Sequence, residues 1–270
     1  MTLRILVTND DGINAPGLAV AEQIAYEIAG KKGKVITFAP AVDQSGVSHS
    51  ISYLRPTLIE KHGDSRYSVE GTPADCVLAG IYYVMKDSKP NLILSGVNNG
   101  HNLAEDILYS GTVGAAMEGA LQGIKSIAMS QCYTKESYSS GNKFKSAGSM
   151  GANICLKLLN SDIWNSDPYQ VFFNVNFPPI QRSEVKGIKL CTQGRRPTGS
   201  FSMNSILSPN GRNFLMVNHQ TNQKLKNTGF NNESDLEKIK RGFVTITPLR
   251  AELTDNSNLE YLKKTFENEL

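Results

Sequence analysis

Residues 3–11 of the chain read LRILVTNDD, an apolar run that ends in one asparagine and two aspartates. A continuous apolar run of this kind is typical of a strand buried on both faces of a parallel sheet. Residues 17–29 then show helical spacing of leucine and isoleucine, and residues 34–38 (KVITF) predict a second strand. This strand–helix–strand order predicts a βαβ unit, from which doubly wound α/β sheets are built.

Predicted strands and helices keep alternating toward the middle of the chain. The strands are expected at residues 91–94, 126–129 and 170–175, and the helices at residues 74–85, 112–122 and 145–159. Residues 50–71 break this order, because they alternate apolar and polar side chains and predict an antiparallel β excursion. We therefore expect an α/β fold with a doubly wound, mostly parallel, Rossmann-like sheet, which forms a catalytic core over residues 1–179.

The composition changes after the Pro-Pro pair at residues 178–179. Residues 180–240 are rich in Asn, Ser, Gly and Arg, and few segments show a clear period. Short strands are predicted at residues 187–191, 214–217 and 243–248, and a terminal helix at residues 258–266. Such segments cannot easily form a core alone, so residues 180–270 are expected to form a C-terminal oligomerisation arm on the core and a partner subunit. The alternative is a surface region without fixed packing.

Length, charge and cysteine content limit the class of protein. The chain has 270 residues, a net charge of +3 and a pI of about 8.5, which is too mild to indicate a nucleic acid polymer as partner. Its four cysteines form neither zinc-type pairs nor a dense disulfide framework. We find no signal-peptide pattern and no run near the ~20 apolar residues of a membrane span. The sequence predicts a cytoplasmic protein with reduced thiols and no membrane partner.

Polar side chains follow three of the predicted strands. They are Asp10 and Asp11 after the first strand, Ser45 after the second, and Asn98, Asn99 and Asn102 after the strand at residues 91–94. In an open α/β sheet, ligands bind at the carboxyl ends of the parallel strands. We therefore expect these side chains to meet at one edge of the sheet.

The adjacent carboxylates of Asp10 and Asp11 require compensation, since two like charges repel strongly when they are desolvated. A hard divalent cation provides it, with neutral oxygens from Ser45 and Asn98 and with water as further ligands. Because no histidine or cysteine cluster accompanies the pair, one Mg²⁺ or Mn²⁺ ion fits better than zinc. An Asp-Asp pair alone is also common in solvated turns, so the interpretation depends on the convergence of the three loops.

Residues 109–114 (YSGTVG) immediately precede a predicted helix. The small residues Ser110, Gly111 and Thr112 leave backbone N–H groups free to point at an anion, and the helix N-terminus adds partial positive charge. Serine and threonine are also ordinary helix caps, so this signal is weak by itself. Beside a cation, however, such a cradle predicts a phosphoryl-transfer site.

An alternative function and the four histidines also bear on this interpretation. A receiver-like phosphate- or nucleotide-sensing module also carries an Asp-Asp pair after its first strand, but Ser95 stands where its phospho-accepting aspartate would be. The four histidines are scattered at positions 49, 62, 101 and 219, and His101 is interpreted as an exposed loop residue rather than a proton shuttle.

Seven motifs together resemble the SurE family of metal-dependent 5′-nucleotidases, in that family's order. They are VTNDDG at 7–12, AP at 39–40 with QSG at 44–46, VEGTPADC at 69–76, SGVN at 95–98, YSGTVGAA at 109–116, NVNFPP at 174–179 and TITPL at 245–249. The resemblance spans most of the chain. Residues 251–254 read AELT where the family commonly has Asp-Leu-Thr, a departure confined to the arm.

The resemblance implies specific roles. Asp10, Asp11, Ser45 and Asn98 would hold one divalent ion per subunit, and Asp10 and Asp11 would be the catalytic residues. Ser110, Gly111 and Thr112 would lie beside the substrate phosphate. From their place after the strand at residues 91–94, Asn99 and Asn102 are also expected to contact the substrate. The implied activity is hydrolysis of nucleoside 5′-monophosphates, and also of 3′-monophosphates and short polyphosphate, in a homodimer or homotetramer. Whether water or an aspartate attacks phosphorus stays open.

Overall fold

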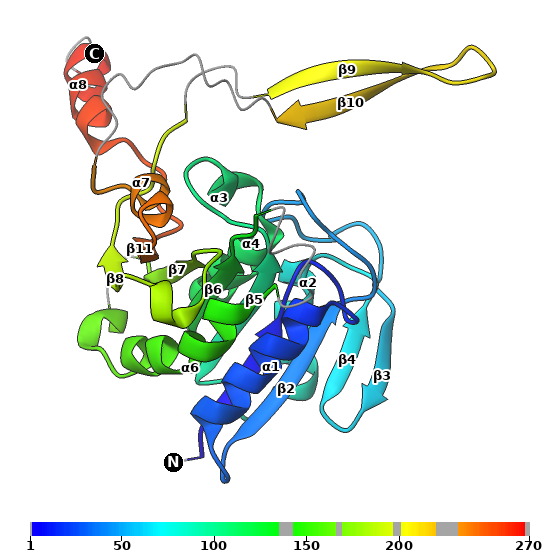
Figure 1. The fold of residues 1–270 in the computed structure, drawn as a ribbon, viewed down its shortest axis with the longest axis vertical. Helices are drawn as coiled ribbons and strands as arrows, with labels where there is room; N and C mark the ends of the chain where they lie inside the picture. The colour runs from blue at the N-terminus through cyan, green and yellow to red at the C-terminus, as the bar shows by residue number, and fades with distance from the viewer. Residues whose placement is uncertain (1, 135–142, 166–168, 197–200, 220–231, 268–270) are drawn as a thin grey trace.

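The computed structural model describes residues 2–134, 143–165, 169–196, 201–219 and 232–267. Its centre is a nine-stranded sheet with the order β3-β4-β2-β1-β5-β6-β7-β11-β8 (Figure 1). Strands β4, β2, β1, β5, β6 and β7 run parallel to one another. The predicted doubly wound, mostly parallel α/β fold is confirmed.

The first βαβ unit forms as predicted, from β1 (Arg4–Thr8), α1 (Pro16–Ala29) and β2 (Lys34–Pro40). Pro16 suits the start of α1, because its missing N–H would have no partner in the first turn. Gly30 ends the helix with φ 61°, a conformation that glycine adopts without strain. At Gly17 a Cβ atom would lie 1.9 Å from the carbonyl oxygen of Val97, so glycine allows α1 to lie directly against β5.

The other elements of the parallel part follow in order along the chain. They are β3 (Ile59–Gly63), β4 (Arg66–Val69), α2 (Pro73–Ala79), a π-helix (Gly80–Val84), β5 (Leu92–Asn99), α3 (Asp106–Tyr109), α4 (Gly111–Leu121), β6 (Lys125–Gln131), α6 (Lys145–Leu159), a 3₁₀ helix (Asp162–Asn165), β7 (Phe172–Phe177) and a second 3₁₀ helix (Arg182–Glu184).

Two apolar layers bury the two faces of the sheet. Ile5 and Val7 of β1 pack with residues of α1 and α6, whereas Leu6 between them packs with residues of α2 and α4. This alternation follows from the pleat of a strand, in which successive side chains point to opposite faces. Figure 1 shows α1 and α6 on one face of the sheet and α2 and α4 on the other.

Two expectations about strands require correction. The excursion at residues 50–71 does contain an antiparallel pair, β3 with β4, but β4 also pairs in parallel with β2 and so extends the main sheet. Strand β5 continues to Asn99, so Asn98 and Asn99 lie in the strand's last residues and not after it. A shift in the register with β6 between Ser95 and Asn98 accompanies this longer strand.

After residue 180, some strands join the nine-stranded sheet and others form a separate two-stranded ribbon. Strands β8 (Ile188–Leu190) and β11 (Val244–Leu249) complete the sheet, β11 antiparallel to β7, and α7 (Asp235–Lys240) packs beside β11. The expected boundary at residues 179–180 therefore does not coincide with an edge of the sheet. Strands β9 (Phe201–Leu207) and β10 (Asn213–His219) form a separate antiparallel ribbon that projects from the sheet in Figure 1.

Helix α8 (Asn256–Phe266) follows β11 and has no buried residue. All four cysteines are buried and free of disulfides, as expected for reduced thiols. None of the helices in the described ranges combines the length and the apolar character needed to cross a bilayer.

Candidate active site

A cavity of about 770 Å³ opens at the carboxyl ends of β1, β2 and β5. The four predicted cation ligands share its wall with residues of α3, the start of α4 and the ribbon. The lining residues are Asp10, Asp11, Ser45, Gly46, Asn98, Asn99, His101, Asn102, Asp106, Tyr109, Ser110, Phe201 and Val217. The three loops therefore converge as the parallel topology predicts.

Asp10 is held from behind by the start of α4. The hydroxyl of Thr112 donates to its Oδ1 at 2.6 Å, and the backbone N–H of Thr112 donates to its Oδ2 at 3.0 Å. Burial raises the pKa of Asp10 to about 6, although the Thr112 hydroxyl and N–H act in the opposite direction. None of the ion pairs among the described residues includes Asp10, so its charge has no cationic side chain to offset it.

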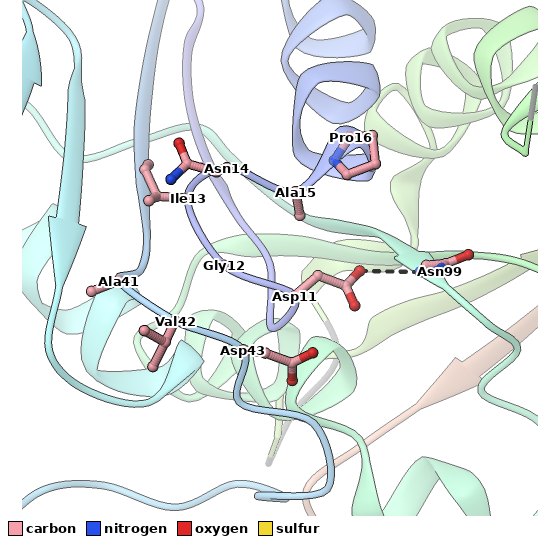
Figure 2. A pocket seen from close by; sticks show the side chains of 11 residues that line it. Asp11, Gly12, Ile13, Asn14, Ala15, Pro16, Ala41, Val42, Asp43 and Asn99 are labelled. Atoms are coloured by element: carbon pink, nitrogen blue, oxygen red, sulfur yellow. Dashed lines mark hydrogen bonds between the residues drawn. The ribbon is translucent and has the colours of Figure 1, made fainter. Parts of the chain in front are cut away.

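Asp11 lies on the other side of the pair. Its Oδ2 accepts the backbone N–H of Asn99 at 3.1 Å, the bond drawn in Figure 2. Burial raises the pKa of Asp11 and the nearby charge of Asp43 adds to this effect, while the Asn99 bond opposes it. A second cavity of about 360 Å³ lies beside Asp11, between residues 12–17 and residues 41–43 (Figure 2).

Hydrogen bonds also hold the segments of the two proposed neutral ligands, Ser45 and Asn98. The N–H of Gln44 donates to the Asp10 carbonyl at 2.8 Å and so ties this loop to the end of β1, while the N–H of Ser45 donates to the Asp43 side chain at 2.7 Å within the loop. The amide nitrogen of Asn98 donates to the Gly100 carbonyl at 3.2 Å, which leaves the amide oxygen available as a ligand.

This donor set fits a hard divalent cation. Two desolvated carboxylates without a cationic partner, one hydroxyl and one amide oxygen are ligands that Mg²⁺ and Mn²⁺ prefer. The raised pKa values of Asp10 and Asp11 show the electrostatic cost of keeping both ionised without such an ion. The described residues contain no group of three or more His, Cys, Asp or Glu side chains that could hold a metal ion, so a cation here would also need the hydroxyl and amide oxygens.

The predicted phosphate cradle divides into two parts. Ser110 caps α4, its Oγ accepting the N–H of Val113 at 3.1 Å, and it lines the cavity. Gly111 and Thr112 do not line it. A Cβ atom on Gly111 would lie 2.9 Å from the Cβ atom of Asp10, and Thr112 is fully buried with its hydroxyl and N–H both on Asp10. Both therefore lie behind Asp10 and support it, and their contact with a phosphate stays a prediction.

Asn102 lines the cavity and is held there by four hydrogen bonds. Its N–H donates to the side chain of Asn176 at 2.8 Å, and its amide nitrogen donates to Ser130 at 2.8 Å. The amide groups of Asn174 and Asn176 in turn donate to the carbonyl of Asn102. These bonds tie the segment after β5 to the ends of β6 and β7, so Asn102 has a fixed place in the wall.

Several residues of the cavity were missed by the sequence analysis. His101 is an exposed loop residue, as predicted, but it also lines the cavity, and its Nδ1 lies 3.1 Å from the carboxylate of Asp106. Arg196 pairs with the same carboxylate at 2.5 Å, and both partners lower the pKa of Asp106. In the sequence, the one indication that His101 lies near the cavity is its position three residues after Asn98.

An aromatic wall faces the ligand groups. Tyr109 and Phe201 meet edge to face with ring centroids 5.8 Å apart and planes at 84°, and Val217 lies in the same wall. Phe201 and Val217 come from the ribbon, which is distant in sequence from the other lining residues. Motif spacing therefore carried no signal for them.

Replacing Thr112 by valine is expected to lower activity about tenfold, because the near-isosteric side chain removes the hydroxyl that orients Asp10. The kcat with saturating cation is the measurement. Thr37→Val is the matched control, since the Thr37 hydroxyl also bonds a carboxylate, that of Glu22 at 2.8 Å, away from the cavity. Equal kcat values for the two variants would refute the supporting role of Thr112.

Comparison with known proteins connects this site to one family. The family model described as survival protein SurE matches residues 5–200. The 5′-nucleotidase SurE of Cereibacter sphaeroides is 49% identical over 261 residues, which are 97% of this chain and 98% of that protein. The protein of the same name from Ruegeria pomeroyi is 48% identical over 263 residues, 97% of this chain and 100% of its own length.

The solved structures agree with the sequence comparison. The crystal structure of the SurE protein from Aquifex aeolicus superposes with a TM-score of 0.76 at 33% identity, covering 97% of this chain and 99% of that one. The match includes the segments that carry Asp10, Ser45 and Asn98, and it confirms the resemblance inferred from the seven motifs. The chain belongs to the SurE family.

Proposed function

We propose that the chain is a divalent-metal-dependent 5′-nucleotidase that hydrolyses nucleoside monophosphates to nucleoside and phosphate. The main observation is the gathering of Asp10, Asp11, Ser45 and Asn98 in one cavity that also contains the N-terminus of α4. Relatives that match almost the whole chain carry the name 5′-nucleotidase SurE. The cavity volume of about 770 Å³ is also sufficient for a nucleotide.

Each part of the site has a role in this reaction. A bound divalent cation supplies charge neutralisation at the transferring phosphoryl group and acidifies a water molecule. Asp10 and Asp11 provide its anionic ligands, and Ser45 and Asn98 its neutral ones. Ser110 at the start of α4 lies where the helix dipole favours the phosphate.

Water is the proposed nucleophile. Asp10 is poorly suited to attack, because Thr112 engages both of its oxygens and it is 4% exposed. The alternative is attack by Asp11 with formation of an aspartyl-phosphate. Direct attack by water inverts the configuration at a chiral phosphorus, whereas two successive displacements retain it. Retention, or a phospho-enzyme trapped by acid quench, would exclude the water mechanism.

Phosphate release from AMP in the presence of Mn²⁺ or Mg²⁺, and its loss on chelation, tests the proposed activity. A panel of 5′- and 3′-monophosphates and short polyphosphate with several cations then defines substrate and metal preference. If the protein binds nucleotide and cation but releases no phosphate with any of these ions, a sensing module is the better interpretation and the nucleotidase proposal fails.

We also propose that the chain acts in the cytoplasm as a homodimer or homotetramer, joined through the ribbon and α8. The four free cysteines support a reducing compartment. The ribbon exposes apolar side chains on both faces, among them Met203, Phe214 and Leu215, and a lone two-stranded ribbon is marginally stable in water. A partner subunit would cover these side chains.

The variant Met203→Glu/Leu215→Glu is expected to lower the molar mass of the assembly, because it places charges in the buried contact. Size-exclusion chromatography with light scattering measures this. Leu54→Glu is the control, since Leu54 is fully exposed on a loop of the core. An unchanged mass for the ribbon variant would show that this surface is not the interface.

A further inference from the structure

Glu118 of α4 is a buried acid that the proposed mechanism does not use. Its side chain is 4% exposed, yet both of its oxygens are bonded. The ring Nε2 of His49 lies 2.6 Å from one oxygen, and the amide of Gln122 donates to the other at 2.6 Å. A buried carboxylate is costly unless it is paired and hydrogen-bonded, so the position of Glu118 depends on His49.

His49 belongs to the loop after β2 that also carries Ser45. None of residues 41–50 is buried, so apolar packing does not hold this loop in place. Gly46, next to Ser45, has φ 77°, and a Cβ atom there would meet nothing within 4 Å, so the loop is open at this point. Polar contacts must therefore determine where the Ser45 hydroxyl lies.

Besides the bond from Gln44 to the Asp10 carbonyl, three polar contacts attach the loop to α3 and α4. Ser48, with φ 58°, donates its N–H to the carbonyl of Tyr109 at 3.0 Å and its hydroxyl to the carbonyl of Leu108 at 2.6 Å. The loop passes so close to α4 that a Cβ atom on Gly114 would lie 2.6 Å from the carbonyl oxygen of Ser48. The His49–Glu118 pair is the next contact along the loop, and it is the only one of the three that joins two side chains.

We propose that His49 and Glu118 are a positioning pair that holds the Ser45 loop on α4 and thereby sets the affinity of the site for its divalent cation. The proposal rests on the proposed function, because it takes Ser45 as a ligand. It gives α4 two roles. Its first turn supports Asp10, and Glu118 in its second turn anchors the loop that carries Ser45.

The test is the affinity of chelator-treated protein for Mn²⁺ alone, measured by the electron paramagnetic resonance signal of the free ion. His49→Ala is expected to weaken binding about tenfold, the usual lower range for a residue that orients a ligand. His49→Gln retains a donor for Glu118 and should restore most of the affinity. His62→Ala is the matched control, because His62 bonds Ser68 at 2.7 Å on the β3–β4 hairpin and should leave the affinity unchanged.

A double-mutant cycle distinguishes positioning from a general structural effect. If His49 acts through Ser45, the variant Ser45→Ala/His49→Ala should bind Mn²⁺ no more weakly than Ser45→Ala alone. Losses that add, or an unchanged affinity in His49→Ala, would overturn the proposal. If His49→Ala fails to fold, His49→Ala/Glu118→Gln removes the link without leaving an unpaired buried charge, and the same tenfold loss is expected.

Asp11→Asn separates this inference from the proposed metal site. If Asp11→Asn abolishes Mn²⁺ binding and His49→Ala leaves it unchanged, only the positioning role fails. If Asp11→Asn binds Mn²⁺ as tightly as the unmodified protein, the metal site itself is wrong.

Discussion

Asp11→Asn is expected to lower metal-dependent phosphate release by at least about 100-fold while the protein stays folded. Asparagine has the same shape, and its amide oxygen can still accept the Asn99 N–H that now bonds Asp11 at 3.1 Å. What disappears is one of the two negative charges that hold the cation. The loss should appear in Mn²⁺ affinity and in kcat together, because the charge is needed both to bind the ion and to use it.

The same variant is expected to keep or gain stability in the absence of metal, in contrast to its loss of activity. Burial and the charge of Asp43 raise the pKa of Asp11, so the ionised side chain is unfavourable in the folded protein without its cation. Removing that charge should leave the melting temperature of the metal-free protein unchanged or higher. Unmodified protein should gain stability from added Mn²⁺, whereas Asp11→Asn should not.

Asp64→Asn is the control, since Asp64 is fully exposed and lies 3.7 Å from Lys61 on the β3–β4 hairpin. Full activity in Asp11→Asn would refute the assignment of this carboxylate. A parallel loss in melting temperature would instead indicate that Asp11 is structural.

The convergence of the four proposed cation ligands could be predicted from the sequence, because their placement needs only the direction of the strands. Asp10 and Asp11, Ser45 and Asn98 each come at or near the end of a parallel strand, and parallel strands end at the same edge. Strand β5 is longer than the apolar segment that predicted it, but Asn98 still lies at the predicted edge of the sheet. Local pattern and topology were sufficient for these four residues.

The rest of the site depends on contacts that no local pattern contains. In the sequence, Thr112 reads as an ordinary residue of a helix start. The packing of α4 on β5 and β6 is what places it beside Asp10. Phe201 and Val217 reach the cavity through the ribbon, far along the chain from Tyr109. The same applies to β11, which lies antiparallel beside β7 after a long intervening segment.

Asp235→Ala is expected to have the largest effect on stability. Asp235 is fully buried at the start of α7 and accepts three backbone N–H groups, those of Leu236 at 2.6 Å, Gly194 at 2.8 Å and Ala104 at 3.1 Å. Each donor left without an acceptor in the interior costs about 1–3 kcal/mol. Burial raises the pKa of Asp235, so its ionised form is unfavourable in the interior and its removal offsets part of this cost. The net loss of unfolding free energy should be roughly 2–4 kcal/mol.

Asp255→Ala provides the comparison that isolates burial, because Asp255 caps α8 through the N–H groups of Ser257 and Asn258 but is exposed. Water can replace that cap, so its loss should cost about 1 kcal/mol or less. Urea unfolding followed by circular dichroism measures both variants. On heating, Asp235→Ala should lose activity at a lower temperature than the one at which it unfolds. The reason is that Ala104, which Asp235 holds, lies between Asn102 and Asp106 of the cavity wall. Equal costs for the two variants would show that the buried bonds of Asp235 do not anchor this segment.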